Sequence, residues 1–275
     1  MFIRKLIPSL LSIALLANVL HAQTVSSNVR DGIYDRNIYK ERKILQYDHL
    51  READVFWEKR IWRVIDIREK INLPFSYPLM PFITILLNAA KTGEITVYSA
   101  LDDKFSSPIT PDDITKSLSS YDTILTIDPV TFEETYKPVV NEFNPEDVKK
   151  FRIKEDWVFD EESSMLVVRI LGISPIRDDY DDNGNFRGEK PMFWCYYPDL
   201  RPILVHFESF NPKNDGVRMT WEDIFEMRMF SSYIYKESNV YDRRIKDYSE
   251  GIDRLYESER VKQNIFEKEH DLWNF

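Results

Sequence analysis

Residues 54–78, DVFWEKRIWRVIDIREKINLPFSYP, impose the strongest constraint on the fold, because they concentrate large apolar side chains among basic ones. The pattern predicts a helix over residues 51–71 that ends before Pro74 and Pro78. At about 100° per residue, the apolar residues of this helix cover nearly its whole circumference. They are Val55, Phe56, Trp57, Ile61, Trp62, Val64, Ile65, Ile67 and Ile71. Such a helix must be covered from more than one direction.

Two kinds of cover fit this pattern. The same chain can wrap its own N-terminal arm over the segment, since core aromatics at helical spacing are common. Alternatively a second protein binds it, because Arg60 and Arg68 lie inside the apolar arc and protein interfaces favour aromatic residues with arginine. The second interpretation makes Trp57, Arg60, Trp62 and Arg68 candidate interface residues. It predicts that residues 34–68 dock on a neighbouring subunit or a partner protein.

The first 22 residues are expected to be a cleaved export signal. Arg4 and Lys5 precede the apolar run LIPSLLSIALLANVL, and Ala22 suits the position before a cleavage site. The run is shorter than the roughly 20 residues of a membrane span. Gln23 follows the cut and Cys195 is the single cysteine, so neither a lipid anchor nor an internal disulfide is expected. These features predict a soluble periplasmic or secreted protein.

Beyond the signal, residues 23–50 have weak periodicity and are expected to form an extended arm, with Tyr34 and Tyr39 as candidate interface residues. Residues 51–275 are expected to form an α+β body, in which an antiparallel β-meander is flanked by helices and the chain ends in a long helix. Strands are expected at residues 94–100, 151–159, 165–173 and 190–197.

Helix-start signals recur along the body. A short apolar helix is expected near residues 81–90. The pairs Thr110–Pro111 and Asn144–Pro145 each place an N-cap residue before a proline, which predicts two further short helices. Thr220 with Asp223 resembles a capping box before another.

The final helix, expected over about residues 247–270, has two apolar faces. Ile252, Leu255, Tyr256 and Phe266 fall on one face, and Val261, Ile265 and Leu272 on the other. Each apolar face must pack against another surface, and the body can supply only one of them directly, so Val261 and Ile265 are candidate interface residues. Trp273 and Phe275 in the tail are candidates as well, because aromatics at a terminus are costly to leave in water unless they dock.

Charge is distributed unevenly along the chain. The net charge is −10, or −12 without Arg4 and Lys5, which disfavours nonspecific binding to nucleic acid or acidic lipid. Residues 36–70 hold ten Lys and Arg against seven Asp and Glu, whereas residues 71–275 hold 24 against 38. A basic N-terminal portion on an acidic body suits head-to-tail contact between subunits, the heterologous kind that can close into a ring.

Motifs for metal binding and catalysis are weak. The run DDYDDNGNFRGEK places Asp179, Asp181 and Asn183 at calcium-loop spacing, but Lys190 stands where a bidentate Glu belongs, and Asn183–Gly184 predicts a hairpin turn instead. The histidines lack ligand spacing, and nucleophile and phosphate-loop motifs are missing, so no catalytic, cofactor or metal residue is assigned. Two alternatives stay open: an exported cell-envelope hydrolase with a carboxylate pair, and a periplasmic module that binds small ligands in an aromatic pocket.

Several segments together resemble the GldN/PorN family of the Bacteroidota type IX secretion system, which also supports gliding motility, and the likeness is nearer to GldN. They are DGIYDR, LREADVFWEKRIWRVIDIREK, GEITVYS, DDNGNFRG, FWCYYP, SSYIYKESNVYDR and ESERVKQNIFEKEHDLWNF. The resemblance spans essentially the whole chain after the signal, and it carries no catalytic motif to transfer.

The resemblance implies a non-enzymatic periplasmic component at the inner face of the outer membrane. Its relatives assemble with an outer-membrane lipoprotein, GldK/PorK, into a ring that the inner-membrane motor protein GldM/PorM contacts. Such rings support the export of proteins that include surface adhesins. The partners implied are therefore these two proteins and further copies of the chain.

Overall fold

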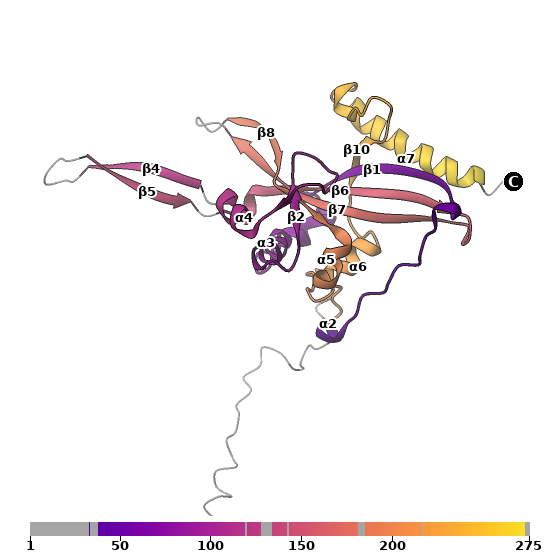
Figure 1. The fold of residues 1–275 in the computed structure, drawn as a ribbon, viewed down its shortest axis with the longest axis horizontal. Helices are drawn as coiled ribbons and strands as arrows, with labels where there is room; N and C mark the ends of the chain where they lie inside the picture. Colours follow the sequence, from indigo (N-terminus) through magenta and orange to yellow (C-terminus); the bar gives the residue numbers. More distant parts are fainter. Residues whose placement is uncertain are drawn as a thin grey trace, which may run out of the picture. The chain divides into compact units, whose positions relative to one another are not determined.

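The computed structural model describes residues 33, 38–118, 120–127, 134–141, 143–180, 185–214 and 216–272. The chain divides into two compact units, Met1–Asn37 and Ile38–Phe275, and every element below belongs to the second. That unit combines an antiparallel sheet with helices, which confirms the expected α+β class (Figure 1).

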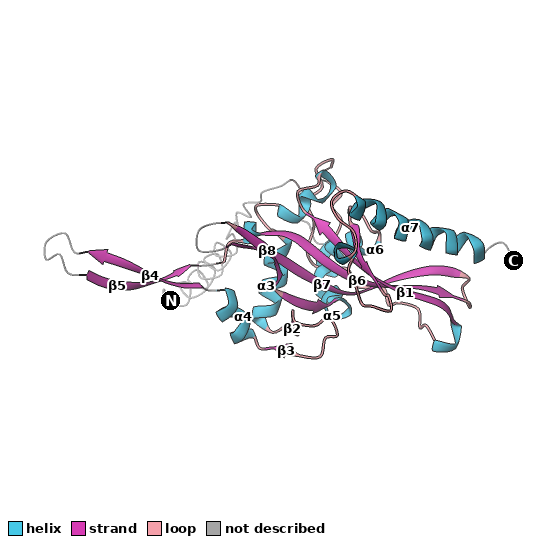
Figure 2. Cartoon of the chain, turned by 90° about the horizontal axis from the view of Figure 1, so that it is seen from above, coloured by secondary structure: helices cyan, strands magenta, loops and turns pink. Residues whose placement is uncertain are grey.

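The sheet has eight strands, and all its pairings are antiparallel. Their order is β10 (Tyr233–Glu237), β1 (Val55–Asp66), β6 (Val148–Asp160), β7 (Met165–Tyr180), β9 (Phe193–Tyr196), β2 (Val97–Ser99) and β3 (Pro108–Ile109), with β8 (Phe186–Pro191) also on β7. The strands β1, β6 and β7 are the longest and form its middle (Figure 2). The expected meander is therefore present, and its third strand is divided into β8 and β9.

The predicted helix over residues 51–71 is wrong, because the structure forms strand β1 there, preceded by a 3-10 turn at Glu52–Asp54 and followed by another at Lys70–Ser76. β1 lies between β10 and β6, so both faces of its second half are buried. A strand buried on both faces is apolar at successive positions, such as Ile61 and Trp62, and therefore resembles a helix that is apolar all round. β-branched and aromatic residues favour the strand.

Two apolar clusters cover this sheet. The larger one joins β1 through Ile65 to helices α3 (Phe82–Thr92), α5 (Tyr197–Leu204) and α6 (Trp221–Glu226). Its centre is a group of buried aromatic rings in edge or tilted contact, namely Phe75, Phe82, Phe151, Trp221 and Phe225. The smaller cluster joins Ile61 and β10 to helix α7 (Asp253–Leu272), which lies along these strands (Figure 1).

The remaining helix signals have mixed outcomes. Helix α4 (Pro111–Leu118) begins after Thr110, whose hydroxyl accepts from the Asp113 N–H, and α6 carries the predicted capping box of Thr220 and Asp223. The signal at Asn144 yields only a 3-10 turn, Pro145–Asp147, since the chain enters β6 directly afterwards. The last helix begins later than expected, because a 3-10 turn, Ile245–Asp247, precedes it.

Several elements were not expected from the sequence, among them β3 and β10. Strands β4 (Ser120–Ile127) and β5 (Glu134–Asn141) pair with each other in a separate two-stranded sheet. A short helix, α2 (Ile38–Glu41), opens the second unit. The strands on either side of the calcium-like run agree with a hairpin, since β7 ends at Tyr180 and β8 begins at Phe186, while residues 181–184 lie outside the described residues.

Candidate functional site: a basic cleft beside an exposed helix face

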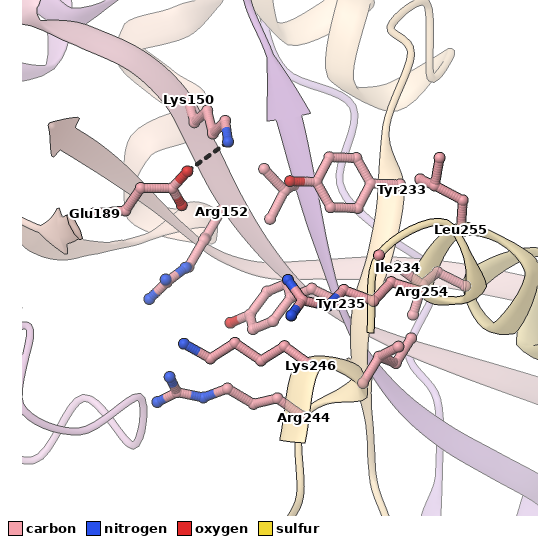
Figure 3. A pocket seen from close by; sticks show the side chains of 13 residues that line it. Lys150, Arg152, Glu189, Tyr233, Ile234, Tyr235, Arg244, Lys246, Arg254 and Leu255 are labelled. Atoms are coloured by element: carbon pink, nitrogen blue, oxygen red, sulfur yellow. Dashed lines mark hydrogen bonds and ion pairs between the residues drawn. The ribbon is translucent and has the colours of Figure 1, made fainter. Parts of the chain in front are cut away.

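A basic cleft is lined by the start of β6, by β10 and the 3-10 turn after it, and by the first turn of α7. It has a volume of about 410 Å³ and continues into a second hollow of about 390 Å³ along β8. Five cationic side chains and a single carboxylate line the first cavity (Figure 3). They are Lys150, Arg152, Arg244, Lys246 and Arg254, with Glu189 as the carboxylate.

Alternation along β6 explains two of these cations. Lys150 and Arg152 are two residues apart on one strand, so they lie on the same face of the sheet. Lys150 Nζ donates to Glu189 on β8. Burial is the largest single influence on the pKa of Lys150 and lowers it, but the bond to Glu189 and the charges of Tyr233, Glu189 and Asp66 together outweigh burial, so the pKa is raised. The one carboxylate of the cleft is therefore already engaged.

The other cations have no carboxylate partner among the residues that the structure describes. Arg152 stacks over the Tyr235 ring at 5.2 Å, and its Nε is buried with no acceptor in the described part of the chain. Burial raises the pKa of Tyr235 to about 12, so this ring stays neutral. Arg244 and Lys246 are exposed and form no ion pair with any described residue. An acidic chain thus presents a local excess of positive charge.

Helix α7 has one covered and one uncovered apolar face. Val261 and Ile265 are buried against Ile61 and Ile234, so the chain itself covers this side. The opposite face is open to solvent, with exposed fractions between 58% and 69%. Its members are Leu255, Tyr256 and Phe266, and the exposed Ile252 lies just before the helix begins. Leu255 also lines the basic cleft, so apolar and cationic surfaces are continuous here.

The segment before β1 is anchored on the body. Tyr47 lies between two guanidinium groups, Arg169 at 3.9 Å and Arg201 at 4.0 Å, and its hydroxyl donates to Glu226. Arg201 also donates to the Leu45 carbonyl at 2.9 Å. Burial, followed by the bond to Glu226, raises the pKa of Tyr47. Arg42 adds an ion pair with Asp223 on α6. No local sequence signal marks this anchor, because its partners are far away in the chain.

Several predicted interface residues lie within the body. Trp62 is buried, and its Nε1 donates to Asp103 at 2.6 Å. Trp57 packs against the smaller core. Arg60, on the same strand, makes a two-point ion pair with Asp156 on β6. Residues 55–66 of the predicted docking segment 34–68 therefore form an internal strand of the sheet.

The other predicted residues differ in position. Arg68 is exposed and pairs with Asp66. Tyr39 belongs to α2, but its side chain lies outside the described part of the chain. Tyr34, Trp273 and Phe275 also lie outside the described residues. Among the described residues, the structure assembles a basic cleft that the sequence analysis did not identify.

Buried carboxylates in the body face arginines. Glu155 is fully buried and accepts from Arg228 at 2.9 and 3.1 Å, and Glu222 accepts from Arg201 at 2.6 Å. These pairs neutralise one another inside the fold, which is a structural arrangement. Across the residues that the structure covers, no group of three His, Cys, Asp or Glu side chains could hold a metal ion. None of the described helices is long and apolar enough to cross a membrane.

Comparison with known proteins gives one family. The family model described as gliding motility associated protein GldN matches residues 50–274, which include the strands and helices that build the cleft and both faces of α7. No curated protein matches the chain. The resemblance inferred from the sequence segments is confirmed over this range. The chain belongs to the GldN family of gliding motility associated proteins.

Proposed function

We propose that this protein is a non-enzymatic structural component of the type IX secretion and gliding machinery. It acts in the periplasm, where it assembles with an outer-membrane lipoprotein into a ring that supports protein export. The family match over residues 50–274 carries the proposal, since members of the GldN family are associated with gliding motility and type IX secretion.

The surface of the body supports an assembly role. The uncovered face of α7 and the basic cleft next to it combine exposed apolar residues with cations, most of which form no ion pair with a described residue. Aromatic residues and arginines of this kind are enriched at the centres of protein interfaces. A GldK/PorK-like lipoprotein, a GldM/PorM-like motor protein and further copies of the chain are the proposed partners.

The alternative of an exported hydrolase with a carboxylate pair gains no support from the geometry. The buried acids Glu155 and Glu222 each have an arginine partner, and Glu189, the carboxylate of the cleft, is bound to Lys150. The small-ligand alternative required a pocket enclosed by aromatic rings. The cleft is instead open and dominated by cations.

Deletion of the gene tests the proposed function. We expect deletion to stop gliding and the export of surface adhesins, and the full chain supplied in trans to restore both. A matched control supplies the chain without residues 1–22, which should stay in the cytoplasm and fail to restore either activity. Normal gliding and normal export in the deletion strain would refute the proposal.

A further inference from the structure

We propose that the basic cleft binds the acidic β6–β7 turn of a second copy of the chain, so that copies join head to tail. The inference deepens the proposed function and rests on it, because it supplies one contact by which an assembly of this protein would grow. The donor surface is the turn at Asp160–Glu162, with Glu52 and Asp54 beside it.

The turn presents carboxylates in a fixed conformation. Asp160 accepts from the backbone N–H groups of Glu162 at 3.1 Å and Ser163 at 3.3 Å, which holds the turn in shape. Glu161 is exposed and makes no ion pair with any described residue. Glu162 is 67% exposed and lies 3.5 Å from Arg51, the nearest cation. Five carboxylates therefore lie at this end of the sheet, where Arg51 pairs with Asp54 at 2.5 Å and leaves Glu52, Glu161 and Glu162 exposed.

The two surfaces have matching charge. The cleft holds five cations and one carboxylate that Lys150 already engages, whereas the turn holds the reverse ratio. Charge complementarity of this kind directs encounter and selects the register of a contact. The buried Nε of Arg152, which has no acceptor among the described residues, gains one when a carboxylate enters the cleft.

Apolar residues accompany the charges on both sides. Phe56 and Met165 flank the acidic turn and are 62% and 56% exposed. Met165 pairs directly with Asp160 across the hairpin, and Phe56 lies edge-on to Phe159. On the other surface, Leu255 lines the cleft. Each surface thus has apolar area next to its charges, as the centre and rim of an interface require.

The two surfaces lie at opposite ends of one strand. Arg152 stands near the start of β6 and Asp160 at its end, eight residues apart, or about 26 Å along an extended strand. One copy cannot close this contact on itself. A contact between different surfaces of identical subunits is heterologous, so it adds copies in one direction and forms a ring or a filament.

The test compares charge reversals in the chain without residues 1–22, with molecular mass followed by sedimentation and light scattering. The wild type should form species larger than dimers at low salt and dissociate as salt screens the charges. Arg244→Glu with Lys246→Glu in the cleft, or Glu161→Lys with Glu162→Lys in the turn, should weaken association at least about tenfold. Lys91→Glu with Lys213→Glu, and Glu94→Lys with Asp112→Lys, are exposed controls that should associate as the wild type does.

Mixing the variants gives the decisive result. The cleft variant keeps a native turn and the turn variant keeps a native cleft, and the reversed turn is also complementary to the reversed cleft. An equal mixture should therefore assemble beyond dimers again, with the two variants alternating. Both pairs of reversals in one chain should restore self-association. A monomeric wild type at low salt, single variants that assemble normally, or a monomeric mixture would each overturn the inference. A cleft variant that still self-associates but no longer binds a lipoprotein partner would also overturn the inference, because the cleft would then bind that partner and not a second copy of the chain. These readouts use purified protein, so they separate this inference from the proposed function, which is judged by export in cells.

Discussion

At the scale of single residues, Tyr47 connects elements that lie far apart in the sequence. It joins the segment before β1 to β7 and α5 through the stacked guanidinium groups of Arg169 and Arg201, and to α6 through one hydrogen bond to Glu226. Cation–π contacts of partly desolvated groups contribute about 0.5–2 kcal/mol each, and a hydrogen bond to a charged group adds about 1.5–3 kcal/mol. Tyr47 therefore holds this segment onto the body.

The Tyr47→Phe substitution separates these two contributions. The phenyl ring keeps the stacking on Arg169 and Arg201 but loses the bond to Glu226, so the free energy of unfolding should fall by about 1–3 kcal/mol. Urea denaturation measures this change. Tyr241→Phe is the matched control, because Tyr241 is 73% exposed, and its effect should stay within about 0.5 kcal/mol. Equal effects of the two substitutions would show that the hydroxyl of Tyr47 contributes nothing.

Stability should also depend on pH through the buried tyrosines. Burial raises the pKa of Tyr47, Tyr197 and Tyr235 in the folded chain. Above the ordinary tyrosine pKa of about 10, the unfolded chain loses these protons and the folded chain keeps them. The folded state then binds more protons, so the free energy of unfolding falls as pH rises beyond about 10.

Urea midpoints at about pH 8 and pH 11 test this sign. The wild type should be less stable at the higher pH, and Tyr47→Phe with Tyr197→Phe should lose less stability over the same interval. An equal loss in the variant would assign the alkaline effect to other groups. The control is again Tyr241→Phe, which should follow the wild type.

At the scale of elements, α7 shows how one helix serves two purposes. Its inner face completes the smaller core with Ile61 on β1, and Ser258 on the same side accepts from the Ile234 N–H on β10, which covers that edge of the sheet. Its outer face contributes little to the fold, since its large apolar residues are exposed.

Neighbouring substitutions on α7 test this division. Ile265→Ala removes a residue that is 5% exposed, and it should lower the free energy of unfolding by about 2–5 kcal/mol. Phe266→Ala, one position further, removes a residue that is 62% exposed and should change stability by less than about 0.5 kcal/mol. Thermal or urea unfolding of the two variants measures both changes in stability. A large loss for Phe266→Ala would mean that the outer face is covered within the chain.

At the scale of the whole molecule, the body from Ile38 onward is a compact unit that includes the anchored segment. Residues Arg42, Leu45 and Tyr47 bind α5 and α6, so the unit begins before the sheet does. Whether the arm also binds a partner is therefore tested with two different truncations.

Removing residues 23–37 takes away only the first unit, and removing residues 23–51 also removes the anchor. We expect the shorter deletion to leave the free energy of unfolding unchanged and the longer one to lower it by about 2–4 kcal/mol. The longer deletion should also abolish co-purification with the lipoprotein partner while circular dichroism shows a folded body. Undiminished binding by the longer deletion would refute docking through the arm.

The sequence by itself determined the fold class, the β6–β7 hairpin strands, the α3 segment, the capping box at Thr220 and the family. These are properties of local pattern, such as alternation along a strand, an N-cap with its acidic partner, or fixed runs of aromatic residues. β1 was mistaken for a helix because a strand buried on both faces loses its alternation, and the remaining apolar run fits either element.

Only the tertiary structure decided which surfaces are covered. Both faces of α7 are apolar in sequence, and the position of β1 and β10 selects Val261 and Ile265 as the buried side. The basic cleft joins residues 150 and 152 to residues 244–254, and the Tyr47 anchor joins residues 42–47 to residues 169–226. Such sites form only when strands and helices that are distant in the sequence pack together. The free energy of burying the whole core decides which elements pack, and no local run of residues determines it.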